Sequence, residues 1–167
     1  MNRVQRLFAN LFDGWFQLRR RFPADVLDDI AAAVAAGEHT HQGEVRLALE
    51  SRLGPWSVLQ GLDARARARR AFVDLHVWDT EHNNGVLIYV LMAERRIEIV
   101  ADRGIAQHVE PAAWNAICAR MQEHFARGAW REGALRGIAD AHALLQRHFP
   151  SDGENRRDEL PDQPVLL

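Results

Sequence analysis

The segment GVLIYVLMA at residues 85–93 constrains the fold most, because it is an unbroken apolar run. A strand with one face in water alternates apolar and polar side chains, whereas this segment is apolar on both faces. It is far shorter than the roughly 20 apolar residues that a membrane-spanning helix needs. We therefore predict a central strand that other elements cover on both faces.

Two other segments show the alternation that is typical of strands with one buried face: GEVRLALES at residues 43–51 and RIEIVADR at 96–103. Helical patterns occupy residues 3–22, 23–38, 62–77, 111–128 and 130–149. Strands joined through a helix run parallel almost without exception. The ERR turn before the last strand predicts an antiparallel hairpin, with a longer crossover as the alternative. The predicted fold class is α/β: a three-layer α/β/α sandwich around a small mixed sheet, with an extra N-terminal amphipathic helix.

The composition narrows the classes of partner. The net charge of −2 favours neither nucleic acid nor an anionic membrane, so we predict no nucleic-acid binding. Arginines at 65, 67, 69 and 70 line the helix at 62–77, and we interpret them as its solvated outer face. The single cysteine, Cys118, excludes an internal disulfide and a multi-cysteine zinc site. Because the first 22 residues lack the features of a signal peptide and no segment could span a membrane, we predict a cytoplasmic protein.

The two ends of the chain are predicted to lie outside the main domain. We divide the chain into an amphipathic N-terminal helix at 1–22, a domain at 23–150 and a disordered tail at 151–167 that is polar and contains proline. The apolar stripe of the N-terminal helix either packs on its own domain or a partner protein, or lies on the inner face of the membrane as a peripheral contact. The stripe consists of Leu7, Phe8, Leu11, Phe12, Trp15, Phe16 and Leu18.

The predicted topology brings three polar loops together. If the strands at 43–51 and 85–93 are parallel, they begin at the same edge of the sheet, and the antiparallel strand at 96–103 ends there. The loops HTHQGE, DTEHNNG and DRG then meet at this edge. Carboxylate and amide oxygens are the ligands that Ca²⁺ and Mg²⁺ prefer. The candidate metal ligands are Glu44, Asp79, Asn83, Asn84 and Asp102.

Other interpretations of these loops stay open. Asn-Asn-Gly is typical of a tight turn, because Asn and Gly tolerate positive φ. His39 and His41 could indicate zinc, although the sequence has no HExxH motif. No nucleophile has an obvious His–Asp partner, and the single cysteine lies on an apolar helix face that indicates a packed thiol, so we assign no catalytic residue.

Several short motifs together resemble the TPM domain family. The stretch EHNNGVLIYVLMAERRIEIVADRGI, with GEVRLALES upstream and FARGAWREGALRGI downstream, matches the family's pattern over residues 25–148. The matching residues are Gly43-Glu44, Asn83-Asn84-Gly85, Ile97-Glu98-Ile99, Arg103-Gly104, Phe125, Gly128, Trp130 and Gly133. The resemblance implies an α/β/α sandwich, a divalent-ion site, often for calcium, in the loops at one edge of the sheet, and acid phosphatase activity.

The chain is similar to the shorter bacterial members of this family, which carry no leader and no membrane anchor. The resemblance implies a protein partner, either a LemA-type membrane protein or an exported TPM protein. We therefore expect a divalent-cation-binding module, with Ca²⁺ or Mg²⁺ as the ion, that is an accessory or interaction protein of a membrane-associated assembly. The alternative that the resemblance implies is a metal-assisted phosphomonoester hydrolase of low activity. It would use Asp79 or Asp102 as ligand or base and Arg103 to bind phosphate oxygens.

Overall fold

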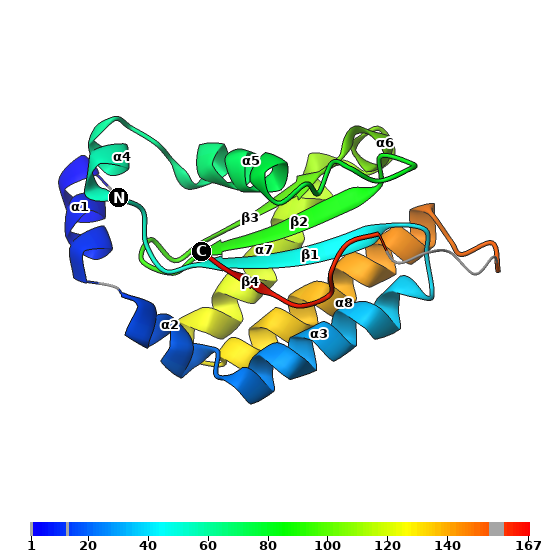
Figure 1. The fold of residues 1–167 in the computed structure, drawn as a ribbon, viewed down its shortest axis with the longest axis horizontal. Helices are drawn as coiled ribbons and strands as arrows, with labels where there is room; N and C mark the ends of the chain where they lie inside the picture. The colour runs from blue at the N-terminus through cyan, green and yellow to red at the C-terminus, as the bar shows by residue number, and fades with distance from the viewer. Residues whose placement is uncertain (1, 13, 154–158) are drawn as a thin grey trace.

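The computed structural model describes residues 2–12, 14–153 and 159–167. Its strands are β1 (Glu44–Glu50), β2 (Gly85–Leu91), β3 (Arg96–Ala101) and β4 (Val165–Leu166). They form one mixed sheet in the order β3-β2-β1-β4 (Figure 1). As predicted, β1 and β2 are parallel, and β3 returns antiparallel to β2.

Helices cover both faces of this sheet, and the predicted α/β sandwich is confirmed (Figure 1). One face carries α3 (Ala24–Glu38), α7 (Pro111–Ala126) and α8 (Trp130–His148). The opposite face carries α5 (Ala64–Asp74), with the short helix α4 (Pro55–Leu59) toward one end. The short helix α6 (Arg103–Ala106) lies at the other end of the sheet, and its buried Ile105 packs in the core of the first face.

The central strand β2 is buried on both faces, which explains its unbroken apolar sequence. Val86 and Ile88 pack in the core beneath α3, α7 and α8, whereas Leu87 and Tyr89 pack in a second core beneath α5. Successive residues of a strand point to opposite faces of the sheet. Each face is therefore closed by its own hydrophobic core.

A polar network is buried beside α5. The Tyr89 hydroxyl donates to the Glu50 carboxylate at 2.6 Å, and Arg67 forms an ion pair with the same carboxylate at 2.8 Å. Burial and the negative charge of Glu50 raise the pKa of Tyr89, so its hydroxyl stays protonated and donates. The prediction that Arg67 belongs to the outer face of this helix is wrong, because the buried carboxylate requires a positive partner.

The N-terminal segment forms two helices, α1 (Arg3–Phe12) and α2 (Trp15–Arg21), where the sequence predicts one. Gly14, which precedes the second helix, has an extended backbone that interrupts the helical path, and residue 13 lies outside the described residues. Leu18 and Phe22 are fully buried in the core beneath α3, α7 and α8, so α2 packs on the domain. Among the described residues, no helix is long and apolar enough to cross a membrane.

The prediction of a disordered tail is wrong for residues 159–167. Leu160 is buried in the core beneath α5, and β4 pairs in parallel with β1. The Leu167 amide donates to the Leu49 carbonyl at 2.9 Å. The free edge of β1 presents unpaired backbone groups, and even a two-residue strand stabilises them. Residues 154–158, which the same prediction covers, lie outside the described residues.

This arrangement predicts that the tail contributes to stability. Replacing Leu160 with Ala removes a side chain that is only 5% exposed, so we expect the free energy of unfolding to fall by about 2–4 kcal/mol. Leu59→Ala is the matched control, because the Leu59 side chain is 53% exposed, and we expect a change below about 0.5 kcal/mol. Urea denaturation measures both. Equal, small effects of the two substitutions would contradict an ordered tail.

Candidate functional site

The strand pairing brings the three polar loops to one edge of the sheet. The register aligns Glu44, the first residue of β1, with Gly85, the first residue of β2. The Asp102 amide, directly after β3, donates to the Gly85 carbonyl at 2.9 Å, and the Glu44 amide donates to the Asn84 carbonyl at 3.1 Å. Of the predicted ligands, Glu44, Asn84 and Asp102 are therefore adjacent along the backbone of this edge, which we call the loop edge.

Tight backbone packing explains part of the motifs at the loop edge. Asn83 has a φ of 52°, in the left-handed region that Asn tolerates. A Cβ atom on Gly85 would clash with the Val77 carbonyl, and one on Gly104 would clash with the Asn83 carbonyl. The turn interpretation thus accounts for Asn83 and for both glycines.

Asn83 is bound to Arg103 through its side chain. Its Oδ1 accepts hydrogen bonds from Nε and Nη2 of Arg103, at 3.1 and 3.0 Å. The Arg103 side chain is exposed and, within the described part of the chain, forms no ion pair with a carboxylate. The Asn83 oxygen already has two donors, so it lacks the free lone pair that a metal ligand needs in this conformation.

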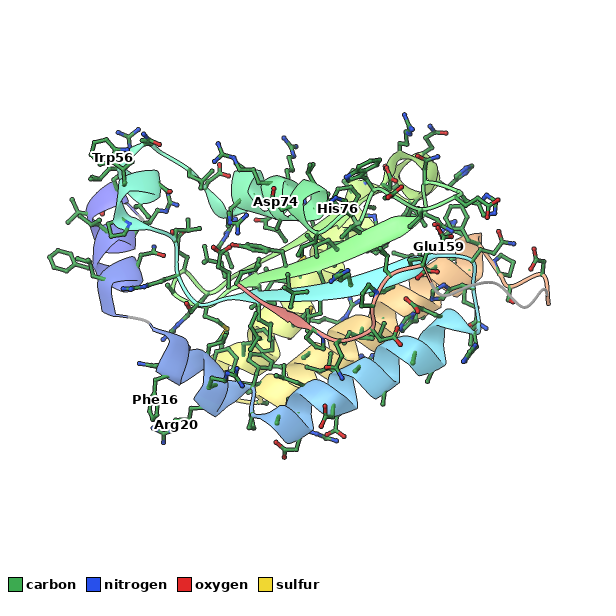
Figure 2. All side chains as sticks on the ribbon, viewed as in Figure 1. Phe16, Arg20, Trp56, Asp74, His76 and Glu159 are labelled. Atoms are coloured by element: carbon green, nitrogen blue, oxygen red, sulfur yellow. The ribbon has the colours of Figure 1, made fainter. Side chains whose placement is uncertain are left out.

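The predicted carboxylates differ in their surroundings. Asp79 is exposed in the turn that follows α5, where its amide donates to the His76 carbonyl at 2.9 Å. Glu44 is 8% exposed, and its Oε2 accepts from the Leu160 amide at 3.4 Å. The tail also brings an acid that the sequence analysis missed, because the Glu159 carboxylate accepts from the Glu81 amide at 2.8 Å (Figure 2).

Two buried oxygens at the loop edge have no hydrogen-bond partner among the described residues: Asn84 Oδ1 and Asp102 Oδ2. The other side-chain atoms of both residues are engaged, since Asn84 Nδ2 donates to the Gln42 carbonyl and Asp102 Oδ1 caps α6 by accepting from the Arg103 amide at 2.7 Å. A buried polar atom without a partner destabilises the fold by about 1–3 kcal/mol.

This donor chemistry fits a hard cation, which binds amide and carboxylate oxygens. Within the described residues, however, no group of three His, Cys, Asp or Glu side chains could hold a metal ion. A cation at the loop edge therefore depends on amide and backbone oxygens in addition to carboxylates. Asn84, Asp102 and the neighbouring Glu44 are the residues that could hold it.

Of the two histidines considered for zinc, His41 belongs to a buried histidine pair and His39 does not. His39 is exposed, but His41 Nε2 lies 2.6 Å from Nδ1 of His142, a partner in α8 that the sequence analysis missed. The Gly43 amide donates to His41 Nδ1 at 3.1 Å, so we assign the ring proton of His41 to Nε2, which donates to His142. One sequence signal for this pair is Gly37, because a Cβ atom at this position would clash with the His142 ring.

Cys118 behaves as a packed thiol. Burial, and then the negative charge of Glu98, raise its pKa to about 11. The thiol is therefore protonated at neutral pH, and Cys118 is unsuited to nucleophilic catalysis.

The histidine pair predicts a specific dependence of stability on pH. Burial lowers the pKa of both His41 and His142 from 6.5 to about 4. The unfolded chain therefore takes up protons between pH 6.5 and 4 that the folded chain does not, and the stabilisation present above pH 6.5 is lost as the pH falls through this window. We expect the free energy of unfolding to fall by roughly 3 kcal/mol for each histidine.

Urea denaturation as a function of pH measures this loss. His142→Gln is expected to flatten the dependence between pH 6.5 and 4, whereas His39→Gln, at an exposed position, leaves it unchanged. An unaltered slope in His142→Gln would refute the role of the pair.

Comparisons with known proteins agree with the fold described above. The TPM domain family matches residues 21–144. The solution structure of the BA42 protein from the psychrophilic bacterium Bizionia argentinensis has 29% sequence identity and a TM-score of 0.77, and the match covers 87% of this chain and 95% of that one. The N-terminal domain of a protein from P. gingivalis shares the fold, with 17% identity, a TM-score of 0.63, and coverage of 77% of this chain and 79% of that one. None of the curated proteins compared with the sequence matches it. Because the family matches most of this chain and the α/β sandwich is present, the chain belongs to the TPM domain family.

Proposed function

We propose that this chain is a divalent-cation-binding TPM module that acts as an accessory or interaction protein of a membrane-associated assembly. The observation that carries the proposal is the pair of buried oxygens, Asn84 Oδ1 and Asp102 Oδ2, that lack a partner among the described residues at the loop edge. Amide and carboxylate oxygens are ligands for a hard cation, and a bound ion would satisfy an oxygen that otherwise destabilises the fold.

The donor set favours Ca²⁺ over Mg²⁺. Calcium accepts irregular sets of amide, carboxylate and carbonyl oxygens, whereas Mg²⁺ demands a near-octahedral arrangement. Asp102 and Asn84 are the proposed ligands, with Glu44 as the third, while Asn83 is engaged by Arg103 and Asp79 is exposed. Because few carboxylates contribute, we expect weak binding, with a Kd on the order of 10⁻⁴–10⁻³ M.

The exposed apolar residues at the N-terminal end support a role in an assembly. Large apolar side chains are exposed on α1, α2 and α4, and Figure 2 shows Phe16, Arg20 and Trp56 at this end of the molecule. They are Val4, Phe8, Leu11, Phe16, Trp56 and Leu59. Apolar groups gathered on one part of a surface mark sites of protein or membrane contact. The proposed partner is a LemA-type or exported TPM protein. We propose that this chain is cytoplasmic and reaches the partner at the inner face of the membrane.

Calorimetric titration with Ca²⁺ and Mg²⁺ tests the cation site. Asp102→Asn preserves the shape of the side chain and its ability to cap α6 but removes its charge, so we expect Ca²⁺ binding to weaken at least about tenfold. Asp79→Asn removes the same charge from the exposed turn and should leave binding unchanged. The proposal fails if the unaltered protein gives no binding heat at millimolar Ca²⁺, or if the two variants behave alike.

A phosphomonoester hydrolase is the second candidate, favoured by Arg103. Its exposed guanidinium is held by the neutral amide of Asn83 and has no acidic partner among the described residues, so its charge is available to a phosphate group. A divalent ion bound nearby would polarise the phosphoryl group.

Turnover of p-nitrophenyl phosphate in the presence of Ca²⁺ or Mg²⁺ tests this activity. We expect Arg103→Gln to reduce turnover by at least about tenfold, because the hydrogen bonds to phosphate are charge-assisted. Arg127→Gln, an exposed arginine at the far end of α7, is the control. Equal residual turnover in both variants would attribute the activity to a contaminant.

A further inference from the structure

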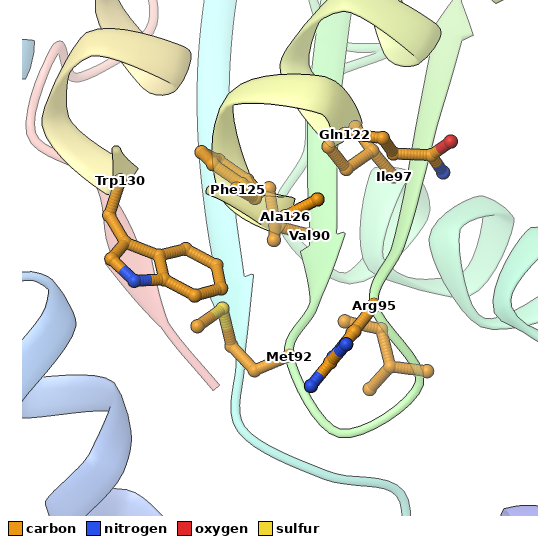
Figure 3. A pocket seen from close by; sticks show the side chains of 9 residues that line it. Val90, Met92, Arg95, Ile97, Gln122, Phe125, Ala126 and Trp130 are labelled. Carbon is orange, nitrogen blue, oxygen red and sulfur yellow. The ribbon is translucent and has the colours of Figure 1, made fainter. Parts of the chain in front are cut away.

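A separate cavity lies at the end of the sheet opposite the loop edge, where β2 ends and β3 begins. Its volume is about 210 Å³ (Figure 3). Strand ends, the end of α7 and the start of α8 line it: Val90, Leu91, Met92, Arg95, Ile97, Gln122, Phe125, Ala126 and Trp130. We call this cavity the turn pocket, because the turn between β2 and β3 contributes Met92 and Arg95 to its lining.

The size and lining of the turn pocket suit an apolar group. An engineered protein cavity of about 150 Å³ binds benzene, so the turn pocket has room for a ring or a short aliphatic chain. One wall is aromatic, since the rings of Phe125 and Trp130 lie 4.8 Å apart, and Phe22 packs at 6.1 Å behind Phe125. Aromatic pairs at this separation stabilise one another beyond the area that they bury.

Arg95 supplies the one charge among the lining residues. Figure 3 shows its side chain beside Met92, across the pocket from Trp130. The neighbouring acid Glu94 is already paired, with Arg6 at 2.9 Å and with the Asn10 amide at 2.9 Å. Arg95 itself has no ion pair within the described residues, so its positive charge is uncompensated.

More positive charge lies on the other side of Trp130. A second hollow, of about 350 Å³, is lined by Gln17, Arg20, Arg21 and Trp130. The Arg21 guanidinium stacks over the Trp130 ring at 4.7 Å from the ring centre. Trp130 therefore lines both an apolar pocket and a hollow that contains two arginines.

We propose that the turn pocket binds an anionic amphiphile, a molecule with a short to medium apolar chain and a carboxylate or phosphate head. The chain fills the space between Phe125, Trp130 and Met92, and Arg95 binds the head. The source of the ligand is either a free fatty-acid-like carboxylate or the acyl and head groups of an anionic lipid. This site shares no residue with the loop edge, so it stands or falls independently of cation binding.

Titration of the full chain with octanoate tests the proposal, with the ¹⁵N-labelled indole signal of Trp130, assigned through Trp130→Phe, as the readout. We expect a saturable shift, and binding about tenfold weaker in Arg95→Gln, because a charge-assisted hydrogen bond is lost. Arg96→Gln is the matched control, since this exposed arginine lies in the next position but does not line the pocket. Ala126→Leu, at an exposed position of the lining, should block binding without unfolding the protein.

Two comparisons test the charge that the ligand must carry and identify its source. Octylammonium has the same chain and the opposite charge, so equal binding of octanoate and octylammonium, or equal effects of Arg95→Gln and Arg96→Gln, would overturn the proposal. Co-sedimentation with phosphatidylglycerol vesicles that is weakened by Arg95→Gln would assign the ligand to a lipid. Octanoate binding without vesicle binding would assign it to a free amphiphile.

Discussion

The parallel pairing of β1 with β2, in the register that aligns Glu44 with Gly85 and Glu50 with Leu91, is the interaction on which the rest of the structure depends. This pairing places both strands inside the molecule, so helices must cover both faces, and it starts both strands at the same edge. The antiparallel return of β3 then brings Asp102 back to that edge. The loop edge is thus a consequence of topology, and its polar residues meet although they are far apart in the sequence.

The two ends of the sheet have opposite chemistry. The loop edge presents amide and carboxylate oxygens, two of which lack partners within the described chain, and it suits a cation. The end with the β2–β3 turn presents an apolar cavity, a stacked Trp130 and uncompensated arginine charge, and it suits an anionic amphiphile. The exposed apolar residues of α1, α2 and α4 lie at this second end (Figure 2), so contact with a partner or membrane there would leave the loop edge accessible.

Much of the fold follows from local sequence. The apolar run of β2 and the alternation in β1 and β3 predict those strands within a few residues, and the strand–helix–strand rule gives their directions. The edge position of Glu44, Asn84 and Asp102 follows from those directions alone. Side-chain pairing does not: Asn83 bonds to Arg103, and His41 pairs with His142 from a helix 101 positions away. Local patterns carry no information about such contacts.

The missed elements also have physical reasons. β4 contains two residues, too few for any periodic signal, and it forms only because β1 offers an open edge. Arg67 looks like part of a solvated stripe in sequence, and only the buried Glu50 beside it explains why it points inward. The apolar turn pocket combines residues from two strands and two helices, so no single segment reveals it.

Residue-resolved ¹H–¹⁵N spectra recorded during a Ca²⁺ titration test the central claim most directly. If the loop edge holds the ion, the amide signals of Asn84, Gly85, Asp102 and Arg103 shift together and saturate, and the shifts disappear in Asp102→Asn. Shifts that grow without saturation, or that fall on exposed acids of α3 such as Asp25 and Asp28 instead, would contradict a built cation site at the loop edge.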